Sequence, residues 1–188
     1  RHMLPHDQIQ LPVPQQVKHD ALNGTISLIR SPSVNYPGEK GAASLLDGLL
    51  SRAKRLNHTD PEWLGFQGQD LEATINLQQL RRIDTLSLHC LQQISVGIFL
   101  PKRVDVYVSK DGSDFHRVTT LVSGIDIQKA GPLDYTFTAQ GMDQQARNLK
   151  IVARNLGTIP KWHKARGAKA WLFADEIFIN SLSGSAAP

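Results

Sequence analysis

The residues best suited to bind a ligand lie together in the stretch "KWHKARGAKAW", residues 161–171. Two tryptophans, one histidine and four cations share these positions. Aromatic rings beside hydrogen-bonding cations could stack on a sugar, contact a nucleic acid or line an enzyme pocket. The same residues could also form a solvated loop whose tryptophans belong to the core. The elements around the stretch must decide between these alternatives.

Catalysis has little support in the sequence. The motifs H-E-x-x-H, G-x-S-x-G, the P-loop and G-x-G-x-x-G are all absent. Asp175 and Glu176 are consecutive in an apolar segment that is typical of a strand, so their side chains should point to opposite faces and cannot act as a catalytic pair. Four histidines are scattered without the spacing of metal ligands: His58, His89, His116 and His163. We therefore predict that the chain is not an enzyme.

Length and composition indicate one globular domain. The chain has 188 residues, of which 40% are hydrophobic and 20% charged. It contains no apolar run of ~18 residues, the length that a membrane-spanning helix needs. The single cysteine, Cys90, excludes an internal disulfide and a multi-cysteine zinc site. Because Cys90 follows Leu86 and Leu88 with a period of two, we predict a buried thiol rather than a nucleophile.

The formal net charge of +4 raises nucleic acid as a partner. The cations are spread along the chain, and neither a recognition helix nor aromatic strands of the RNA-binding type accompany them. A solvated basic surface is the better interpretation, and we predict no nucleic-acid partner.

The two ends of the chain differ from its middle. Residues 1–16 begin with "RHM", which looks like a vector remnant, and contain three prolines without periodicity, as expected of a tag and linker. Residues 181–188 are small and polar and predict a flexible tail. The folded domain is therefore expected over residues 17–180.

Strand signals dominate this middle part. Apolar residues alternate with polar ones, or form short continuous runs, in the segments 71–77, 85–91, 103–109, 134–139, 149–156 and 171–180. Asp111-Gly112 predicts a hairpin turn, with the return strand starting at Phe115. About eight short strands joined by Gly, Pro and Asp turns predict an all-β fold, an antiparallel β-sandwich or jelly roll. The alternation predicts this core: Leu71, Ala73, Ile75, Leu86, Leu88, Val104, Val106, Val108, Ile151, Ile177 and Ile179.

Several stretches, taken in order, resemble one group of domains. The most specific are "DLEATINL" (70–77), "SKDGSDF" (109–115) and "WHKARGAKAWLFADEI" (162–177). They resemble the C-terminal domains of bacterial family 20 glycoside hydrolases (β-hexosaminidases), especially from Bacteroidetes. Those domains are galactose-binding-like β-sandwiches of the discoidin type, related to coagulation factor 5/8 type C domains and to carbohydrate-binding module family 32. The resemblance covers roughly residues 17–180 and includes no part of a catalytic barrel.

The resemblance also implies a structural calcium ion. It would be held by the carboxylates of Asp47 and Glu176, the carbonyl of Asp175 and loop carbonyls after Gly48, and oxygen ligands of this kind suit calcium. Alternatively, Asp47-Gly48 is only a turn and Glu176 a solvated strand residue. The segment 49–63 is longer and more basic than in relatives, which should weaken a divalent ion.

A sugar site is implied at the loop end of such a sandwich. An aromatic ring would pack on the C–H face of a sugar while polar groups bond its hydroxyls. The residues with this chemistry are Trp162, His163, Lys164 and Arg166, with Arg55, Asn57 and His58 on a facing loop.

Core roles compete with this site. Trp63 and Trp171 are expected in the core, Trp162 could cap the sandwich, and His163 could fix its loop by bonding to the backbone. Relatives also carry a tryptophan where this chain has Val96-Gly97, so one aromatic platform is missing here.

Two functions remain. The first is a non-catalytic carbohydrate-binding module of a secreted β-hexosaminidase-like enzyme, binding glycans that end in galacto- or N-acetylhexosamine sugars. The second is a non-binding accessory domain that packs on the catalytic domain of the same parent chain and stabilises it. Either would be periplasmic or extracellular.

Overall fold

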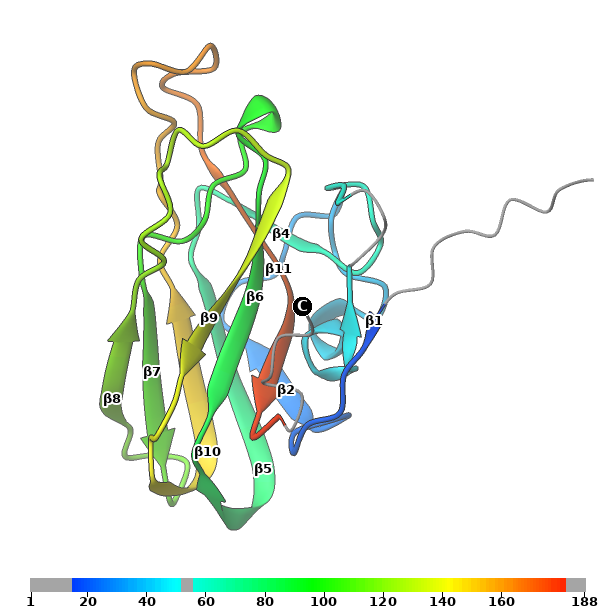
Figure 1. Cartoon of the computed structure of the whole chain (residues 1–188). Helices are drawn as coiled ribbons and strands as arrows, with labels where there is room; N and C mark the ends of the chain where they lie inside the picture. The colour runs from blue at the N-terminus through cyan, green and yellow to red at the C-terminus, as the bar shows by residue number, and fades with distance from the viewer. Residues whose placement is uncertain (1–14, 52–55, 182–188) are drawn as a thin grey trace, which may run out of the picture.

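The computed structural model describes residues 15–51 and 56–181, which form two packed antiparallel sheets (Figure 1). The five-stranded sheet has the order β2 (Thr25–Leu28), β5 (Leu71–Ile83), β10 (Gln144–Ala153), β7 (Val104–Ser109) and β8 (His116–Leu121). The four-stranded sheet has the order β4 (Leu64–Gln67), β11 (Trp171–Ile179), β6 (Leu86–Gln92) and β9 (Leu133–Ala139). The predicted all-β sandwich is confirmed.

The core lies between the two sheets and follows the alternation of the sequence. Inward-facing side chains of β5, β6, β7, β10 and β11 form one cluster. All of the predicted core residues belong to it and are fully buried: Leu71, Ala73, Ile75, Leu86, Leu88, Val104, Val106, Val108, Ile151, Ile177 and Ile179. Cys90 is also fully buried, and burial raises the pKa of its thiol well above the ordinary value, as expected of an inert core thiol.

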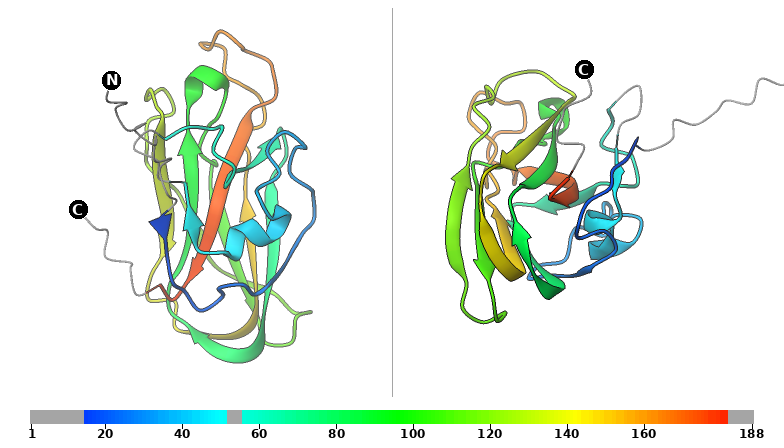
Figure 2. Two further views of the ribbon diagram at one scale, coloured as in Figure 1. Left: turned by 90° about the vertical axis from the view of Figure 1, so that its right-hand side faces the viewer. Right: turned by 60° about the horizontal axis from the view of Figure 1, so that its bottom comes forward.

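Strand β11 is covered on both of its faces. The 3-10 helix η1 (Gly41–Leu46) packs against it from outside the sandwich, beside the short pair β1 (Gln15–Gln16) and β3 (Leu49–Leu50) (Figure 2). Every residue from Leu172 to Ile179 is therefore buried. This explains why the segment is almost continuously apolar, because a strand without a solvated face loses the alternating pattern. It also means that Asp175 and Glu176 are both fully buried.

Strand β5 differs most from its prediction. It continues past residue 77 to Ile83, but its pairing with β10 is interrupted between Asn76 and Arg81. In the interruption Gln78 takes a left-handed conformation with φ of 65°. A bulge of this kind bends a strand and re-aims its side chains. By contrast, the predicted hairpin turn is present, with Gly112 at φ 83° and the return strand β8 starting at His116.

Long loops gather at the upper end of the sandwich in Figure 1. The loop between β10 and β11 rises there beside a second 3-10 helix, η2 (Ile94–Val96). Within the described ranges no helix is long and apolar enough to cross a membrane.

Candidate functional site

The loop of residues 158–169 is a closed excursion that carries the predicted sugar-binding residues. A β-bridge between Thr158 and Lys169 closes its base, and Gly167, at φ 83°, donates its N–H to the carbonyl of Ile159. A side chain at this backbone conformation would be strained, so glycine is suited to the turn. The loop is therefore a shaped element at the upper end of the sandwich.

His163 attaches this loop to η2. Its Nε2 lies 2.5 Å from the carbonyl oxygen of Ile94, and its Nδ1 accepts a hydrogen bond from the Ala165 N–H at 2.9 Å. The ring is buried, and both of its nitrogens are engaged with backbone groups. His163 therefore positions the loop, which is the structural role that the sequence left open for it.

Trp162 stands partly outside the core. It is 43% exposed, and its ring meets Phe99 nearly edge to face at 6.2 Å. Lys164 and Arg166 are exposed, and neither side chain forms an ion pair with another described residue. A half-exposed indole beside free cations has the chemistry to stack on a sugar ring and to bond its hydroxyls.

The loop that carries Asn57 and His58 contacts Gln93, the residue that directly precedes η2. His58 Nδ1 lies 3.3 Å from Oε1 of Gln93, and the His58 ring meets Tyr36 at 6.2 Å. Asn57 folds back locally, because its Oδ1 accepts the Thr59 N–H at 3.1 Å. Arg55 lies outside the described residues.

Gln93 and Ile94 thus bring the predicted residues to one end of the fold. These consecutive residues bind His58 and His163, which lie more than a hundred positions apart in sequence. Asn57 and His58 and the Trp162 loop therefore flank the same short helix. At the position where the sequence resemblance predicts a tryptophan, Val96 is 41% exposed and Gly97 has a positive φ of 78°.

The other tryptophans are only partly as predicted. Trp63 is buried, and its Nε1 donates to the carbonyl of Asn57 at 3.0 Å. Trp171 is only half-buried, and its ring meets Tyr36 edge to face at 5.2 Å. Both rings pack with Phe173, so they support the loop end from beneath.

The predicted calcium ligands lie around β11. Burial, together with the Asp47 and Asp175 carboxylates, raises the pKa of Glu176 to about 11. Its Oε1 lies 3.3 Å from His19 Nε2, while its Oε2 is buried without a hydrogen-bond partner among the described residues. Burial lowers the pKa of His19 to about 4, so at neutral pH this ring is uncharged. With a pKa of about 11, the Glu176 carboxyl is itself protonated at neutral pH unless a cation is bound beside it.

These observations fit a cation better than a solvated strand residue. A buried, ionised carboxylate next to a second carboxylate is costly, so Glu176 must either keep its proton, as its raised pKa indicates, or bind a positive charge. The β-bulge at Asp175 interrupts the pairing of β11 with β6, as a carbonyl ligand at that residue would require. Lys40 is an alternative source of positive charge at this site, because its Nζ lies 3.5 Å from Asp47 Oδ2. No described group of three or more His, Cys, Asp and Glu side chains forms a metal site, so carbonyls would have to complete the ligand set.

A buried Asp–His–Asp cluster was not predicted. His89 Nδ1 lies 2.7 Å from Asp175 Oδ1, and its Nε2 lies 2.7 Å from Asp134 Oδ2. Burial alone would lower the pKa of His89, but the two carboxylates outweigh it and raise this pKa to about 9. Trp63 stacks on the imidazolium at 5.6 Å. The only sequence signal was a histidine within the apolar alternation of β6.

Comparison with known proteins supports the fold. No family model and no curated protein sequence matches the chain. Among solved structures, CpGH89CBM32-5 from Clostridium perfringens, in complex with GalNAc-β-1,3-galactose, aligns with a TM-score of 0.50 and 15% identity over 84% of this chain and 94% of its own. The family 32 module of C. perfringens NanJ, in complex with galactose, aligns with a TM-score of 0.50 and 14% identity over 87% and 97%.

A third structure extends the similarity. A mutant of chitosan-binding module 1 from a Paenibacillus chitosanase/glucanase aligns with a TM-score of 0.51 and 12% identity over 88% of this chain and 98% of its own. The fold is therefore the galactose-binding-like β-sandwich found in family 32 carbohydrate-binding modules. At these identities the similarity establishes the fold alone, and it gives no support to a family 20 β-hexosaminidase as the parent enzyme.

Proposed function

We propose that this domain is a non-catalytic carbohydrate-binding module. Its ligand would be a terminal hexose or N-acetylhexosamine, of the galacto or N-acetyl class, held at the end of the sandwich that carries Trp162 and Arg166. The structural neighbours that were solved with galactose and GalNAc-β-1,3-galactose support this class of ligand.

One observation carries the proposal: the half-exposed ring of Trp162, which packs edge to face with Phe99 and His163 on a loop that His163 anchors. An indole that is fixed before binding loses little conformational entropy when a sugar stacks on it. The free cations Lys164 and Arg166 lie within four residues of this ring and can donate to hydroxyl or acetamido oxygens. One ring and few polar contacts predict weak affinity, from about tens of micromolar to millimolar.

The test is a titration of the isolated domain with galactose, N-acetylgalactosamine and N-acetylglucosamine, followed by tryptophan fluorescence and amide resonances. Arg166→Ala should weaken binding about three- to tenfold without changing stability, because the side chain is free. Trp162→Ala should abolish binding, and Trp162→Phe should retain part of it. Lys110→Ala, an exposed cation outside the loop end, is the matched control and should bind as the unchanged protein does.

Salt distinguishes a sugar from a nucleic acid. Binding of a neutral sugar should change little as salt rises, whereas nucleic-acid binding falls steeply. If no sugar moves any loop resonance, the carbohydrate proposal is wrong and the accessory-domain function takes its place. The described exposed apolar side chains that could contact a catalytic domain come from separate segments: Ile29, Val34, Leu80, Val96, Val122 and Trp162.

We also propose that calcium stabilises the domain. The carboxylates of Asp47 and Glu176 would hold it with the Asp175 carbonyl, and the ion would displace the proton that Glu176 otherwise keeps at neutral pH. The ion would have a structural role only. The parent would be a secreted glycoside hydrolase of the β-hexosaminidase type, so the domain would be periplasmic or extracellular.

A further inference from the structure

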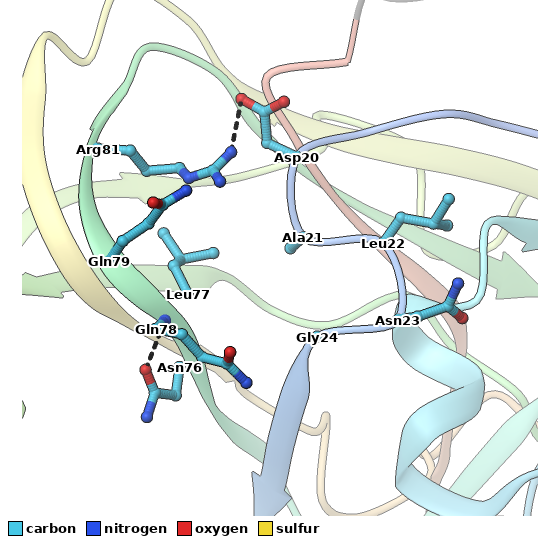
Figure 3. A pocket seen from close by; sticks show the side chains of 10 residues that line it. All are labelled: Asp20, Ala21, Leu22, Asn23, Gly24, Asn76, Leu77, Gln78, Gln79 and Arg81. Atoms are coloured by element: carbon cyan, nitrogen blue, oxygen red, sulfur yellow. Dashed lines mark hydrogen bonds and ion pairs between the residues drawn. The ribbon is translucent and has the colours of Figure 1, made fainter.

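A cleft lies between the turn at residues 20–24 and the bulge of β5 (Figure 3). These segments are at the opposite end of the sandwich from the Trp162 loop (Figure 1). The volume of the cleft is about 480 Å³, within the range of roughly 300–1,000 Å³ that is usual for ligand pockets. The sugar site proposed above does not use any of its residues.

The cleft exists because β2 and β5 separate from each other. β2 and β5 are paired only as far as Thr25 and Asn76. Beyond that point the chain before β2 turns away, with Gly24 N–H bonded to the Ala21 carbonyl, while β5 enters its bulge. The bulge is held by a hydrogen bond of 2.7 Å from the Gln78 N–H to Asn76 Oδ1. The walls are therefore formed by ordered backbone.

An ion pair closes one end of the cleft. Arg81 Nη1 lies 3.6 Å from Asp20 Oδ2, and the same oxygen accepts a hydrogen bond from Asn180 Nδ2 at 3.0 Å. The Nε of Arg81 is buried without a hydrogen-bond partner among the described residues. The pair leaves the cleft without net charge, so neither an anion nor a cation is favoured as its ligand.

The remaining lining is rich in amides. The exposed side chain of Gln79 lies on the cleft side and forms no hydrogen bond with any described residue, whereas the side chain of Asn23 points away from the cleft (Figure 3). The Gln79 amide can donate and accept, and Asp20 and Arg81 add one strong acceptor and one fork of donors. Leu77 lies between the two walls and supplies apolar surface (Figure 3). This mixture matches a ring that carries hydroxyls on its rim and C–H groups on its face.

We propose that this cleft is a second binding site, and that it takes one unit of a neutral saccharide. Gln79 and the Asp20–Arg81 pair would bond the hydroxyls, and Leu77 would contact the C–H face. Since no aromatic ring lines the cleft, affinity should be millimolar and should tolerate different epimers. The module would then hold saccharide at both of its ends.

The test is an amide-resonance titration of the whole domain with methyl β-galactoside, methyl β-glucoside and, as an anionic comparison, inorganic phosphate. Either glycoside should shift the resonances of residues 20–24 and 76–81 with saturation, and phosphate should not. Gln79→Ala should weaken the binding that these resonances report by about three- to tenfold, because it loses one or two hydrogen bonds. Asn23→Gly should change it little, because the Asn23 side chain points away from the cleft (Figure 3). The glycine retains the left-handed backbone of Asn23, whose φ is 55°.

Two controls separate this site from the sugar site at the other end. Gln128→Ala removes an exposed glutamine outside the cleft and should change nothing. Arg166→Ala should leave the cleft resonances responding as before, whatever happens at the Trp162 loop. The proposal is overturned if neither glycoside shifts the cleft resonances, if only phosphate does, or if Gln79→Ala binds as the unchanged protein does.

Discussion

Replacing His89 by glutamine should destabilise the fold strongly. The imidazolium lies between Asp175 and Asp134, with 2.7 Å contacts on both sides, and Asp175 is fully buried. Glutamine is neutral and cannot replace both hydrogen bonds of the imidazolium. The Asp175 carboxylate therefore keeps its hydrogen bond from the Ser51 N–H but loses its positively charged partner. Breaking a buried ion pair in this way costs about 3–5 kcal/mol. For a domain of this size, that corresponds to a melting temperature lower by about 6–20 °C.

Thermal and urea unfolding followed by circular dichroism would measure this loss, with calcium held constant. His116→Gln is the matched control, because His116 is exposed and forms only one long hydrogen bond, at 3.4 Å to Gln144. It should change the free energy of unfolding by less than about 0.5 kcal/mol.

A double-mutant cycle assigns the loss to the ion pair. Asp175→Asn alone should also be costly, since it leaves the His89 charge with one partner. The two changes together should cost clearly less than their sum, with a coupling of about 2 kcal/mol or more. Our interpretation of the cluster would be refuted if His89→Gln cost less than about 1 kcal/mol, or if the two changes were additive.

Two further predictions concern other charged groups. If calcium binds as proposed, a chelator should lower the melting temperature. Added calcium at about 100 times its dissociation constant should raise the free energy of unfolding again by about 2.7 kcal/mol, whereas Glu176→Gln should no longer respond to calcium. An identical melting curve with and without chelator would contradict the calcium proposal. Burial raises the pKa of Asp105, but hydrogen bonds from Thr120 and Arg103 outweigh it and the net shift is downward from 3.8. A carboxyl group whose pKa is lowered by folding stabilises the fold at pH values above its unfolded-state pKa. This stabilisation is lost as the pH falls through the folded-state pKa. Asp105→Asn should therefore lower the free energy of unfolding by about 1–3 kcal/mol at pH 7. Urea unfolding should show that the stability difference between the variant and the unchanged protein becomes smaller below about pH 4. A stability difference that does not depend on pH would contradict this prediction.

The sandwich could be predicted because its strands follow a simple rule. In the first half of β5 buried and partly exposed residues alternate as the sequence does, so the pattern predicts the core face directly. In β6 and β7 the alternating apolar residues also face the core, but most of the polar residues between them are buried as well. The bulge of β5 could not be predicted in the same way. Its residues "LQQL" (77–80) are neither alternating nor rich in turn formers, and their conformation depends on where β2 stops pairing.

The clusters of side chains were harder to predict than the strands. The Asp–His–Asp cluster combines residues from β6, β9 and β11, and only the register of three strands brings them together. His163 was recognised as a possible loop anchor, but its partner, the carbonyl of Ile94, is a backbone atom with no sequence signature. The chemistry of a residue can be read from its type, whereas its partner depends on tertiary packing.

The resemblance to hexosaminidase C-terminal domains remains a prediction, and the departures expected from it fall outside the predicted core. Val96-Gly97 stands where that resemblance predicts an aromatic residue, and residues 49–63 are strongly basic, while the predicted core residues are all buried. Core positions are constrained by packing, so a sandwich persists at 12–15% identity while its loops change. With no aromatic residue at 96–97, stacking at the upper end would depend on Trp162. If the domain binds a sugar as proposed, its ligand should therefore differ from that of structural neighbours with other loop residues, even though the fold is shared.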